Sequence, residues 1–288
     1  MLDLVHVRSF VEVAERGTIV AAATSLGYTA PAVSQHVAKL EKELGVALFE
    51  RQRKRLALSG HGRALLATAL HLLDGERRAR EAVLGHSGRP RVVIAGFASA
   101  IGLVVVPRLG SLSGRFALEV VELEDEPAMR ELRLGGVDVV LTQDYDGSHG
   151  SRRPDHRHVP VLHDQLRLVL PAGRDPGATI GQFDGASWIL NGTDTRCARA
   201  TRAILDRAGL RYQVAGVVDD THTVLALVAA GHGLTIMPEL VAGDRPDVTV
   251  AAQDLGVART ILALTRPEPS PPAAELVELL VEPVPPGP

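Results

Sequence analysis

The chain of 288 residues contains a single cysteine, Cys197. One thiol cannot form an intramolecular disulfide or a multi-cysteine metal site, which suits a reducing compartment. Long hydrophobic runs are absent as well: none reaches the roughly 18 residues that a membrane helix needs, and the start Met1-Leu2-Asp3 has no basic and then apolar signal region. We therefore expect a cytoplasmic protein in which Cys197 is a small buried side chain.

The charge is distributed unevenly along the chain. The net charge is −3, but residues 1–90 hold 13 Lys and Arg against 9 Asp and Glu, whereas residues 91–288 hold 18 against 25. A small basic part joined to a larger acidic part predicts that the basic part binds a polyanion and that the acidic part has a different function. The length also favours two domains, at about 150 residues each.

The first 58 residues predict a helix-turn-helix followed by a wing. Apolar periodicity, hydroxyl caps and closing glycines predict helices over residues 4–16, 18–26 and 29–44. In the third helix an apolar stripe faces the core, and the opposite face offers hydrogen-bonding and positive groups to a major groove. The stripe is Val33, Val37, Leu40 and Leu44, and the opposite face is Ser34, Gln35, Ala38, Lys39 and Lys42.

A basic turn follows this helix. Residues 46–49 and 56–58 predict two short strands, and four positive side chains lie in the turn between them. The positive side chains of such a cluster repel one another unless an anion lies between them, which favours a role in binding an anion. A solvated surface turn is the alternative. The four residues are Arg51, Arg53, Lys54 and Arg55.

A longer helix is predicted from Ser59 to about Leu84, and Gly75 inside it is compatible with a bend or an early stop. Its near-heptad apolar stripe favours pairing with the same helix of a second subunit. Packing against its own amino-terminal domain is the alternative, and the two can coexist. The stripe consists of Leu65, Leu66, Ala69, Leu72 and Leu73, and residues 59–90 form the predicted linker and hinge.

Residues 91–288 predict a two-lobed α/β domain. Strands and helices alternate twice, which is typical of parallel sheets with right-handed crossovers. Lobe one is predicted at about 91–162 and 265–288, and lobe two at about 163–264. Strands at 159–162, 165–170 and 259–264 would make the two crossings between the lobes, with a cleft at the hinge.

Together these segments resemble the LysR-type transcriptional regulators, over nearly the whole chain. The resemblance implies an α/β protein with a winged helix-turn-helix, a linker helix and a periplasmic-binding-protein-like effector domain. It also implies a homo-oligomer, a dimer or more commonly a tetramer, that binds an interrupted dyad in a promoter. Binding of a small molecule is then expected to change how the protein contacts this DNA. The motifs that carry it are Phe10-Val11-Glu12-Val13-Ala14-Glu15, Thr18, Ala22-Ala23, Pro31-Ala32-Val33-Ser34, Leu40 to Val46, Leu48-Phe49-Glu50-Arg51, Gly136-Val137-Asp138, Leu166 to Pro171, and Leu227 to Leu234 with Pro238.

We predict DNA contacts from the amino end of the third helix and from the wing, because the helix dipole there also favours phosphate. Gln35 can read an adenine edge, or it can touch only phosphate or water. Members of the family often carry glutamine where Ala30 stands, so the resemblance does not supply the operator sequence. The predicted DNA-binding residues are Thr29, Ala30, Pro31, Ser34, Gln35, Lys39, Arg51, Arg53, Lys54 and Arg55.

For the effector, the turn from Gly96 to Ala100 ends a strand and begins a helix, so free amides and the Ser99 hydroxyl suit a carboxylate or another anion. Ser99 as an ordinary helix cap is the alternative. Asn191 to Thr193 follow a strand at the equivalent place in lobe two. The predicted effector-binding residues are Ser99, Ala100, Thr142, Asn191, Gly192, Thr193, Thr221 and His232.

We expect neither catalysis nor a metal nor a cofactor. Ser99 lacks the Gly-x-Ser-x-Gly turn of a nucleophile, and His149, His156, His158 and His163 do not stand at a recognised ligand spacing. An enzyme and a purely architectural DNA-binding protein are the rival classes. The expected partners are double-stranded promoter DNA, a small-molecule effector, further copies of the chain and RNA polymerase, with no membrane.

Overall fold

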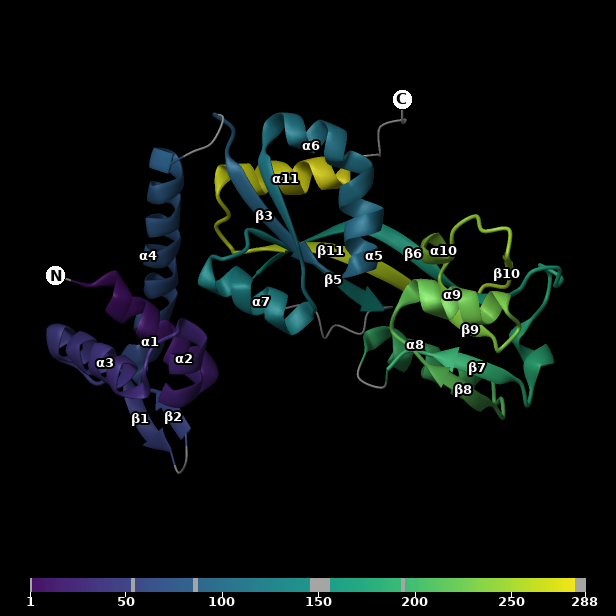
Figure 1. Ribbon diagram of the computed structural model, residues 1–288, viewed down its shortest axis with the longest axis horizontal. Helices are drawn as coiled ribbons and strands as arrows, with labels where there is room; N and C mark the ends of the chain where they lie inside the picture. The colour runs from purple at the N-terminus through teal and green to yellow at the C-terminus, as the bar shows by residue number, and fades with distance from the viewer. Residues whose placement is uncertain (1, 53–54, 85–87, 146–155, 193–194, 283–288) are drawn as a thin grey trace. The chain divides into compact units, whose positions relative to one another are not determined.

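The computed structural model describes residues 2–52, 55–84, 88–145, 156–192 and 195–282 (Figure 1). Arg53, Lys54, Thr193 and His149 therefore lie outside the described residues. Among those described, no helix has both the length and the apolar character needed to cross a bilayer. Contacts divide the chain into a first unit, residues 1–93 with 115–119 and 126–138, and a second unit, residues 94–114, 120–125 and 139–288.

The first unit begins with the three predicted helices. Asp3, Thr18 and Thr29 cap them, each side chain accepting a hydrogen bond from an amide of the first turn. Each helix ends at a glycine with a positive φ, as expected for a left-handed cap. The elements are α1 (Leu4–Arg16), α2 (Ile19–Leu26), α3 (Ala30–Leu44), β1 (Phe49–Gln52), β2 (Arg55–Leu58) and α4 (Gly60–Leu84).

Two expectations for this unit are wrong. Leu44 at the end of the stripe is 37% exposed, whereas Val33, Val37 and Leu40 are buried. The first wing strand is Phe49–Gln52 and not 46–49, because the Leu48 amide donates to Glu41 Oε1 at 2.7 Å and its carbonyl accepts from the Ser59 amide. The β1–β2 ladder thus continues to Gln52 opposite Arg55, which places Arg51 and Arg55 on strands.

Helix α4 continues through Gly75 without a break. Its predicted stripe is partly used within the chain: Ala69 and Leu73 are buried in the same cluster as Val7, Phe10 and Leu40, and Leu65 and Leu66 pack against that cluster. Leu72 stays 39% exposed. Packing on the chain's own domain therefore accounts for most of the stripe, and Leu72 is the member that stays exposed.

A seven-stranded sheet organises the rest of the chain, in the order β10-β6-β11-β5-β3-β4 with β9 paired to β6. β3 and β5 are parallel, and the late strand predicted at 259–264 is present as β11, which pairs antiparallel with both β5 and β6. β7 and β8 form a separate parallel pair. The strands are β3 (Arg91–Gly96), β4 (Ala117–Glu122), β5 (Val139–Tyr145), β6 (Arg157–Pro171), β7 (Ser187–Leu190), β8 (Gln213–Val217), β9 (Thr235–Pro238), β10 (Val248–Val250) and β11 (Ala258–Thr265).

One further expectation is corrected here. Residues 157–171 form one continuous strand, β6, and not two, because the same strand pairs with β11 along one stretch and with β9 and β10 along the next. Residues 98–115 are helical but irregular: α5 (Ala98–Ala100), a π turn (Ile101–Val105), a 3-10 turn (Val106–Arg108) and α6 (Leu109–Arg115) follow one another. Pro107 has no amide to donate, which interrupts a regular α-helix.

The remaining helices are α7 (Asp125–Leu134), α8 (Arg196–Arg207), α9 (Thr221–Ala229), α10 (Glu239–Ala242) and α11 (Pro271–Val281), with a 3-10 turn at Ile180–Phe183. The core of the second unit includes a hydrophobic cluster that surrounds Trp188 and contains Leu166, Leu168 and Leu205, and another that packs α9 against Val169 and Ile189. Both clusters contain residues of β7, which the predicted effector residues Asn191 and Gly192 directly follow.

Candidate nucleic-acid interface and effector site

Helix α3 has one buried face and one exposed face. Val33 and Leu40 are fully buried and Val37 is 6% exposed, so this stripe is committed to the core. The polar residues Ser34, Gln35 and Lys39 on the other face are exposed and make no hydrogen bond or ion pair with another described residue. Their donors and acceptors are therefore available to a partner.

The amino end of α3 is also open. Thr29 is exposed and its hydroxyl accepts from the Ala32 amide, while Pro31 in the first turn has no amide to satisfy. The remaining first-turn amides and the helix dipole favour an anion such as phosphate at this end. Of the wing, the backbone register places Arg51 and Arg55 on the two strands.

A pair of histidines joins α3 to α1, which the sequence analysis missed. His36 Nδ1 lies 2.9 Å from Ser9 Oγ, and the ring centroids of His6 and His36 are 5.3 Å apart. Tyr28 meets His36 edge-on, and Nδ1 of His6 is buried without a hydrogen-bond partner among the described atoms. Burial lowers the pKa of His36, and His6 and Lys39 lower it further, while Asp3 acts in the opposite direction. The signal in the sequence is that His36 lies between Val33 and Val37 on the apolar stripe.

Among the predicted effector residues, Ser99 lies where β3 ends. Ser99 does not cap the helix, because Phe97 holds the cap position. Its hydroxyl instead accepts a hydrogen bond of 3.0 Å from Arg259 Nη1. Ala100 is fully buried and its amide donates to the Phe97 carbonyl, so this predicted free amide is occupied.

Arg259 is a second residue that the sequence analysis missed. It is 2% exposed, and its Nη2 donates to Asp164 Oδ2 at 2.7 Å, which gives the buried cation a partner. Its Nε has no hydrogen-bond partner among the described atoms, and its guanidinium lies 6.0 Å from the Phe97 ring centroid. The signal for it is a single charge within the otherwise apolar strand β11.

Thr142 lies on β5, one residue beyond Leu141, which pairs with Gly96 at the end of β3. Its hydroxyl donates to Asp125 Oδ1 at 2.8 Å, and Arg196 Nε approaches Asp125 Oδ2 at 3.1 Å. Arg196 also donates to the Gln143 carbonyl at 2.8 Å. Since β3 and β5 are parallel, Ser99 and Thr142 share the carboxyl edge of the sheet, where open α/β sheets bind ligands.

Negative charge gathers beside this group. Partial burial raises the pKa of Glu124, and the carboxylates of Asp125, Glu122 and Asp219 raise it further. Arg259 thus offers donors beside Ser99, whereas the residues around Glu124 offer acceptors.

The predicted residues of lobe two also follow parallel strands. Asn191 Nδ2 donates to the Val218 carbonyl at 3.2 Å, and the Gly192 amide donates to Asp219 Oδ1 at 2.8 Å. Thr221 begins α9 directly after these residues, and its helix is capped by Asp220. The structure therefore brings Asn191, Gly192 and Thr221 to the carboxyl ends of β7 and β8.

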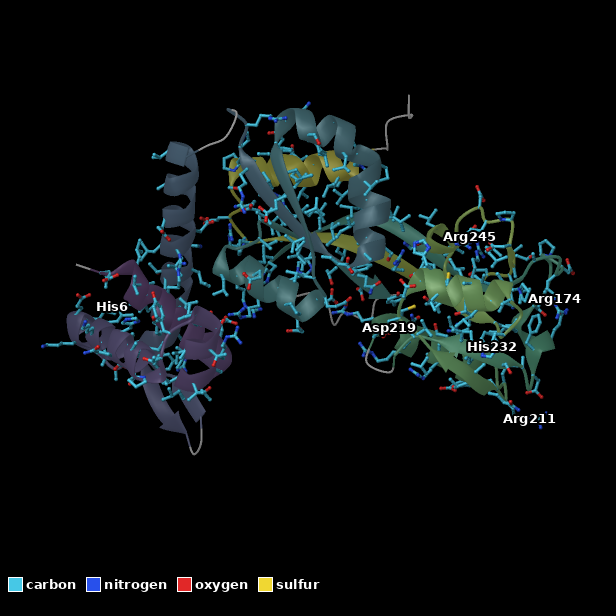
Figure 2. The ribbon with its side chains drawn as sticks, viewed as in Figure 1. His6, Arg174, Arg211, Asp219, His232 and Arg245 are labelled. Carbon is cyan, nitrogen blue, oxygen red and sulfur yellow. The ribbon has the colours of Figure 1, made fainter. Side chains whose placement is uncertain are left out.

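His232 does not join them. It is exposed and precedes β9, whose neighbouring residue Leu234 bridges Trp188 near the start of β7. In a parallel arrangement the starts and ends of strands lie at opposite edges, so His232 lies away from Asp219 and Asn191; Figure 2 labels His232 and Asp219. The structure therefore does not bring His232 to the other predicted effector residues, and its part in effector binding stays a prediction.

Cys197 packs against the Trp188 cluster. Burial raises the pKa of its thiol, and burial together with Cys197 raises the pKa of Tyr145. A thiol protonated at neutral pH is a poor nucleophile. The described residues contain no group of three or more His, Cys, Asp or Glu that could hold a metal.

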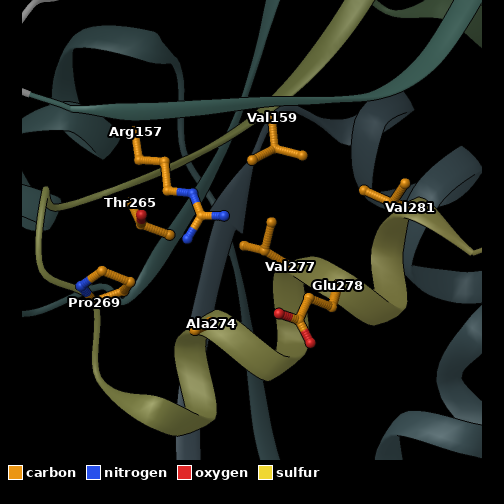
Figure 3. A pocket seen from close by; sticks show the side chains of 8 residues that line it. All are labelled: Arg157, Val159, Thr265, Pro269, Ala274, Val277, Glu278 and Val281. Atoms are coloured by element: carbon orange, nitrogen blue, oxygen red, sulfur yellow. The ribbon is translucent and has the colours of Figure 1, made fainter.

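One pocket lies apart from all these residues (Figure 3). It has a volume of about 220 Å³ and lies between α11 and β6, with Arg157, Val277 and Glu278 in its lining. It contains none of the predicted effector residues, and it is smaller than the roughly 300 Å³ at which ordinary ligand cavities begin. The predicted effector residues therefore remain the better candidates for a ligand site.

Comparison with known proteins gives a consistent picture. Residues 4–63 match the bacterial regulatory helix-turn-helix protein, lysR family, and residues 85–284 match the LysR substrate binding domain. The transcriptional regulator TfdS of Cupriavidus pinatubonensis is 30% identical over 253 residues, which is 85% of each chain. These similar proteins are regulators of transcription, not enzymes.

Two solved structures resemble the fold over its whole length. A full-length OxyR variant from Pseudomonas aeruginosa is 22% identical, with a TM-score of 0.60 over 98% of this chain and 94% of that one. Full-length CbnR complexed with its target DNA is also 22% identical, with a TM-score of 0.53 over 97% of this chain and 98% of that one. At these identities the likeness establishes the fold alone.

The lowered pKa of His36 predicts acid sensitivity of the α1–α3 packing. The unfolded chain binds a proton near the ordinary pKa of 6.5, and the folded chain binds it only at lower pH, so stability is full above pH 6.5 and falls below it. We expect the urea midpoint of the first unit to decrease from pH 7.5 to pH 5.5, and this decrease to shrink in His36→Gln. The exposed His232→Gln is the control. An equal pH dependence in wild type and His36→Gln would contradict this assignment.

Proposed function

Because the chain belongs to the LysR family of bacterial transcriptional regulators, we propose that it binds promoter DNA as a homo-oligomer and that a small molecule with an anionic group modulates this binding. The domains in this proposal are residues 1–58 for DNA, 59–90 for linkage and pairing, and 91–288 for the effector. On a promoter, RNA polymerase is the further partner that we propose.

The observation that carries the proposal is the exposed face of α3. Ser34, Gln35 and Lys39 are exposed and unpaired within the described chain, next to an open helix amino end. In a major groove such groups can reach base edges and phosphates. The wing residues Arg51 and Arg55 would add phosphate contacts beside the helix, together with Arg53 and Lys54.

For the effector, support comes from Ser99 and Arg259. Ser99 is half-buried and hydrogen-bonded to the guanidinium, whose Nε has no partner among the described atoms. A carboxylate that reaches Ser99 would meet a charged donor, which makes a stronger hydrogen bond than a neutral one. Thr142, Asn191, Gly192 and Thr221 are the further residues we assign to the ligand site, with Thr193 following them in sequence.

Removal of the Lys39 charge tests the DNA contact. If Lys39 neutralises one phosphate, Lys39→Ala should weaken binding to all duplexes and lower the slope of log K against log salt by about 0.9. Arg174→Ala removes the same charge from an exposed position in the second unit and should leave the slope unchanged. Fluorescence anisotropy over a salt series measures both, and an unaltered slope in Lys39→Ala would remove this residue from the interface.

Small carboxylates test the effector site. A ligand that binds only the folded chain at 100 times its Kd should stabilise it by about 2.7 kcal/mol, visible as a rise in the unfolding midpoint. We expect one carboxylate class to do this, and Ser99→Ala to lose the rise while Ser113→Ala on the exposed surface of α6 retains it. If no carboxylate stabilises the chain, or if Ser99→Ala gains as much as wild type, the assignment fails.

Leu72 tests the pairing role of α4. Leu72→Asp places a charge at the exposed member of the stripe, so we expect analytical ultracentrifugation to show a shift toward monomer with the unit still folded. His71→Asp is the matched control, because residue 71 is also exposed but points about 100° away from Leu72 around the same helix. Unchanged assembly of Leu72→Asp would place the pairing surface elsewhere.

A further inference from the structure

Helix α7 is shared by the two units of the chain. Its first residue, Asp125, belongs to the second unit, whereas residues 126–138 belong to the first. A single helix of ten residues therefore takes part in both sets of contacts. A rigid secondary element with contacts at both ends can carry energetic coupling between them.

The amino end of α7 contacts the proposed effector residue Thr142 and its neighbour Arg196. Asp125 accepts from Thr142 at 2.8 Å and pairs with Arg196 at 3.1 Å. Arg196 in turn donates to the Gln143 carbonyl, next to Thr142 on β5. A ligand that competes for Thr142 would therefore act directly on the start of this helix.

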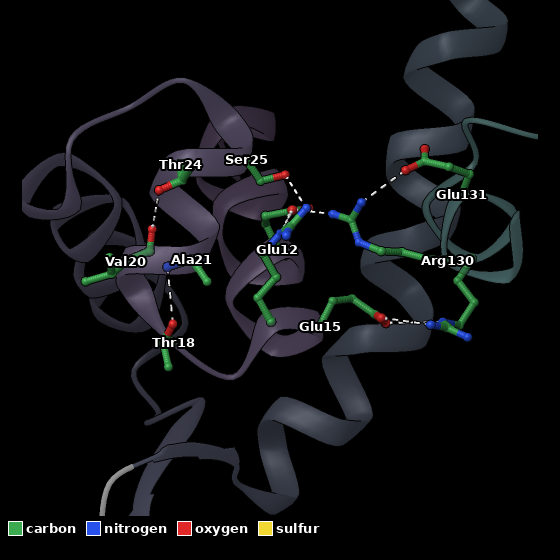
Figure 4. Close-up of polar contacts among 11 residues, drawn as sticks. Glu12, Glu15, Thr18, Val20, Ala21, Thr24, Ser25, Arg130 and Glu131 are labelled. Atoms are coloured by element: carbon green, nitrogen blue, oxygen red, sulfur yellow. Dashed lines mark hydrogen bonds and ion pairs between the residues drawn. The ribbon is translucent and has the colours of Figure 1, made fainter. Parts of the chain in front are cut away.

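The carboxyl-terminal half of α7 contacts α1 through two ion pairs (Figure 4). Arg130 Nη2 pairs with Glu12, and Arg133 holds both carboxylate oxygens of Glu15, with Nη2 at 3.0 Å and Nε at 3.3 Å. Leu134 adds an apolar contact, because it packs against the cluster of Val7 and Phe10. α7 supplies the positive charges and α1 the negative ones.

Because Glu12 is buried, its pairing with Arg130 matters for the stability of α1. Glu12 is only 4% exposed, and a buried carboxylate is costly unless it is paired. Besides Arg130 it accepts from Arg16 Nε at 2.5 Å within its own helix. Because Arg133 bonds both carboxylate oxygens of Glu15, the pair fixes the orientation of the two side chains as well as the distance between them.

Helix α1 also supports α3. Phe10 and Leu40 lie in one buried cluster, Val13 and Val33 in the next, and Ser9 contacts His36. We propose that α7 couples the effector residues to the DNA-binding helix through the ion pairs Glu12–Arg130 and Glu15–Arg133. The inference rests on the proposed function, of which it names the regulatory connection.

Charge exchange tests the contact itself in the full-length chain. Arg133→Glu and Glu15→Arg each place like charges opposite one another, and the double variant restores an opposite pair. We expect each single variant to raise amide hydrogen exchange in α1 at least about 5-fold, the lower end of ordinary coupling, and the double variant to return it toward wild type. Glu278→Arg, an exposed charge change on α11, should have no effect. Equal exchange in all variants would overturn the proposal.

Thr142→Val tests the coupling without an identified ligand, because it removes the hydrogen bond to Asp125. In wild type we expect it to change both α1 exchange and the Kd for duplex DNA, by about 5-fold or more. In the Arg133→Glu background the same substitution should have no further effect, and in the charge-exchanged double variant the effect should return. An effect of the same size in every background, or none in any, would overturn the coupling.

The two measurements separate the possible failures. Hydrogen exchange is recorded without DNA, so it reports the connection between Thr142 and α1 even if the chain binds no duplex. Absence of DNA binding with intact exchange coupling contradicts the proposed function alone. DNA binding that is unaffected by Thr142→Val, together with unaffected exchange, contradicts the coupling alone.

Discussion

Burial of the apolar stripe of α3 is the constraint on which the rest of the structure depends. Val33, Val37 and Leu40 gain roughly 1.5–3 kcal/mol each by leaving water, and they do so in clusters with residues of α1, α2, α4 and the wing strands. Their burial decides which face of the helix stays outside. The polar residues Ser34, Gln35 and Lys39 are exposed as a consequence of packing, and the caps at Thr29 and Gly45 fix where that face begins and ends.

The second unit uses a different constraint to gather its polar residues. Parallel strands run in one direction, so Ser99 and Thr142 both lie beyond the last paired residues of β3 and β5, and Asn191 and Thr221 follow β7 and β8. The buried pair of Arg259 and Asp164 lies beside the first group. Loss of one partner would leave an uncompensated buried charge, so the pair is costly to separate. It joins β11 to β6 at paired positions and keeps the guanidinium of Arg259 beside Ser99.

The local parts of this fold were predictable from the sequence, and the long-range parts were not. Helix periodicity with Thr18, Thr29 and the closing glycines defined α1 to α3 nearly to the residue, because caps and apolar spacing are short-range signals. The continuous strand β6 was missed because its pairing with β9 and β11 depends on residues about 70 to 100 positions away.

The candidate site residues likewise divide into those that local sequence signals predict and those that depend on long-range contacts. Ser99 and Thr142 were predicted from strand ends, and the structure places them near one another. It does not place His232 with the other predicted residues, because the sequence does not tell at which end of a strand pair a loop lies. Arg259 and the His6–His36 pair were missed because their importance lies in burial and partners, and a single polar residue in an apolar segment does not identify its partner. The ion pairs between α7 and α1 join residues more than 100 positions apart, and no local sequence pattern predicts them.

The central claim is that the exposed face of α3 and the adjoining wing dock on duplex DNA. The most direct measurement is equilibrium binding of the purified, assembled chain to double-stranded fragments of its own genome over a range of salt concentrations. The account predicts at least one fragment bound about 1,000-fold more tightly than unrelated duplex, with affinity falling steeply as salt rises. Binding with no preference for any fragment at any salt concentration would contradict it.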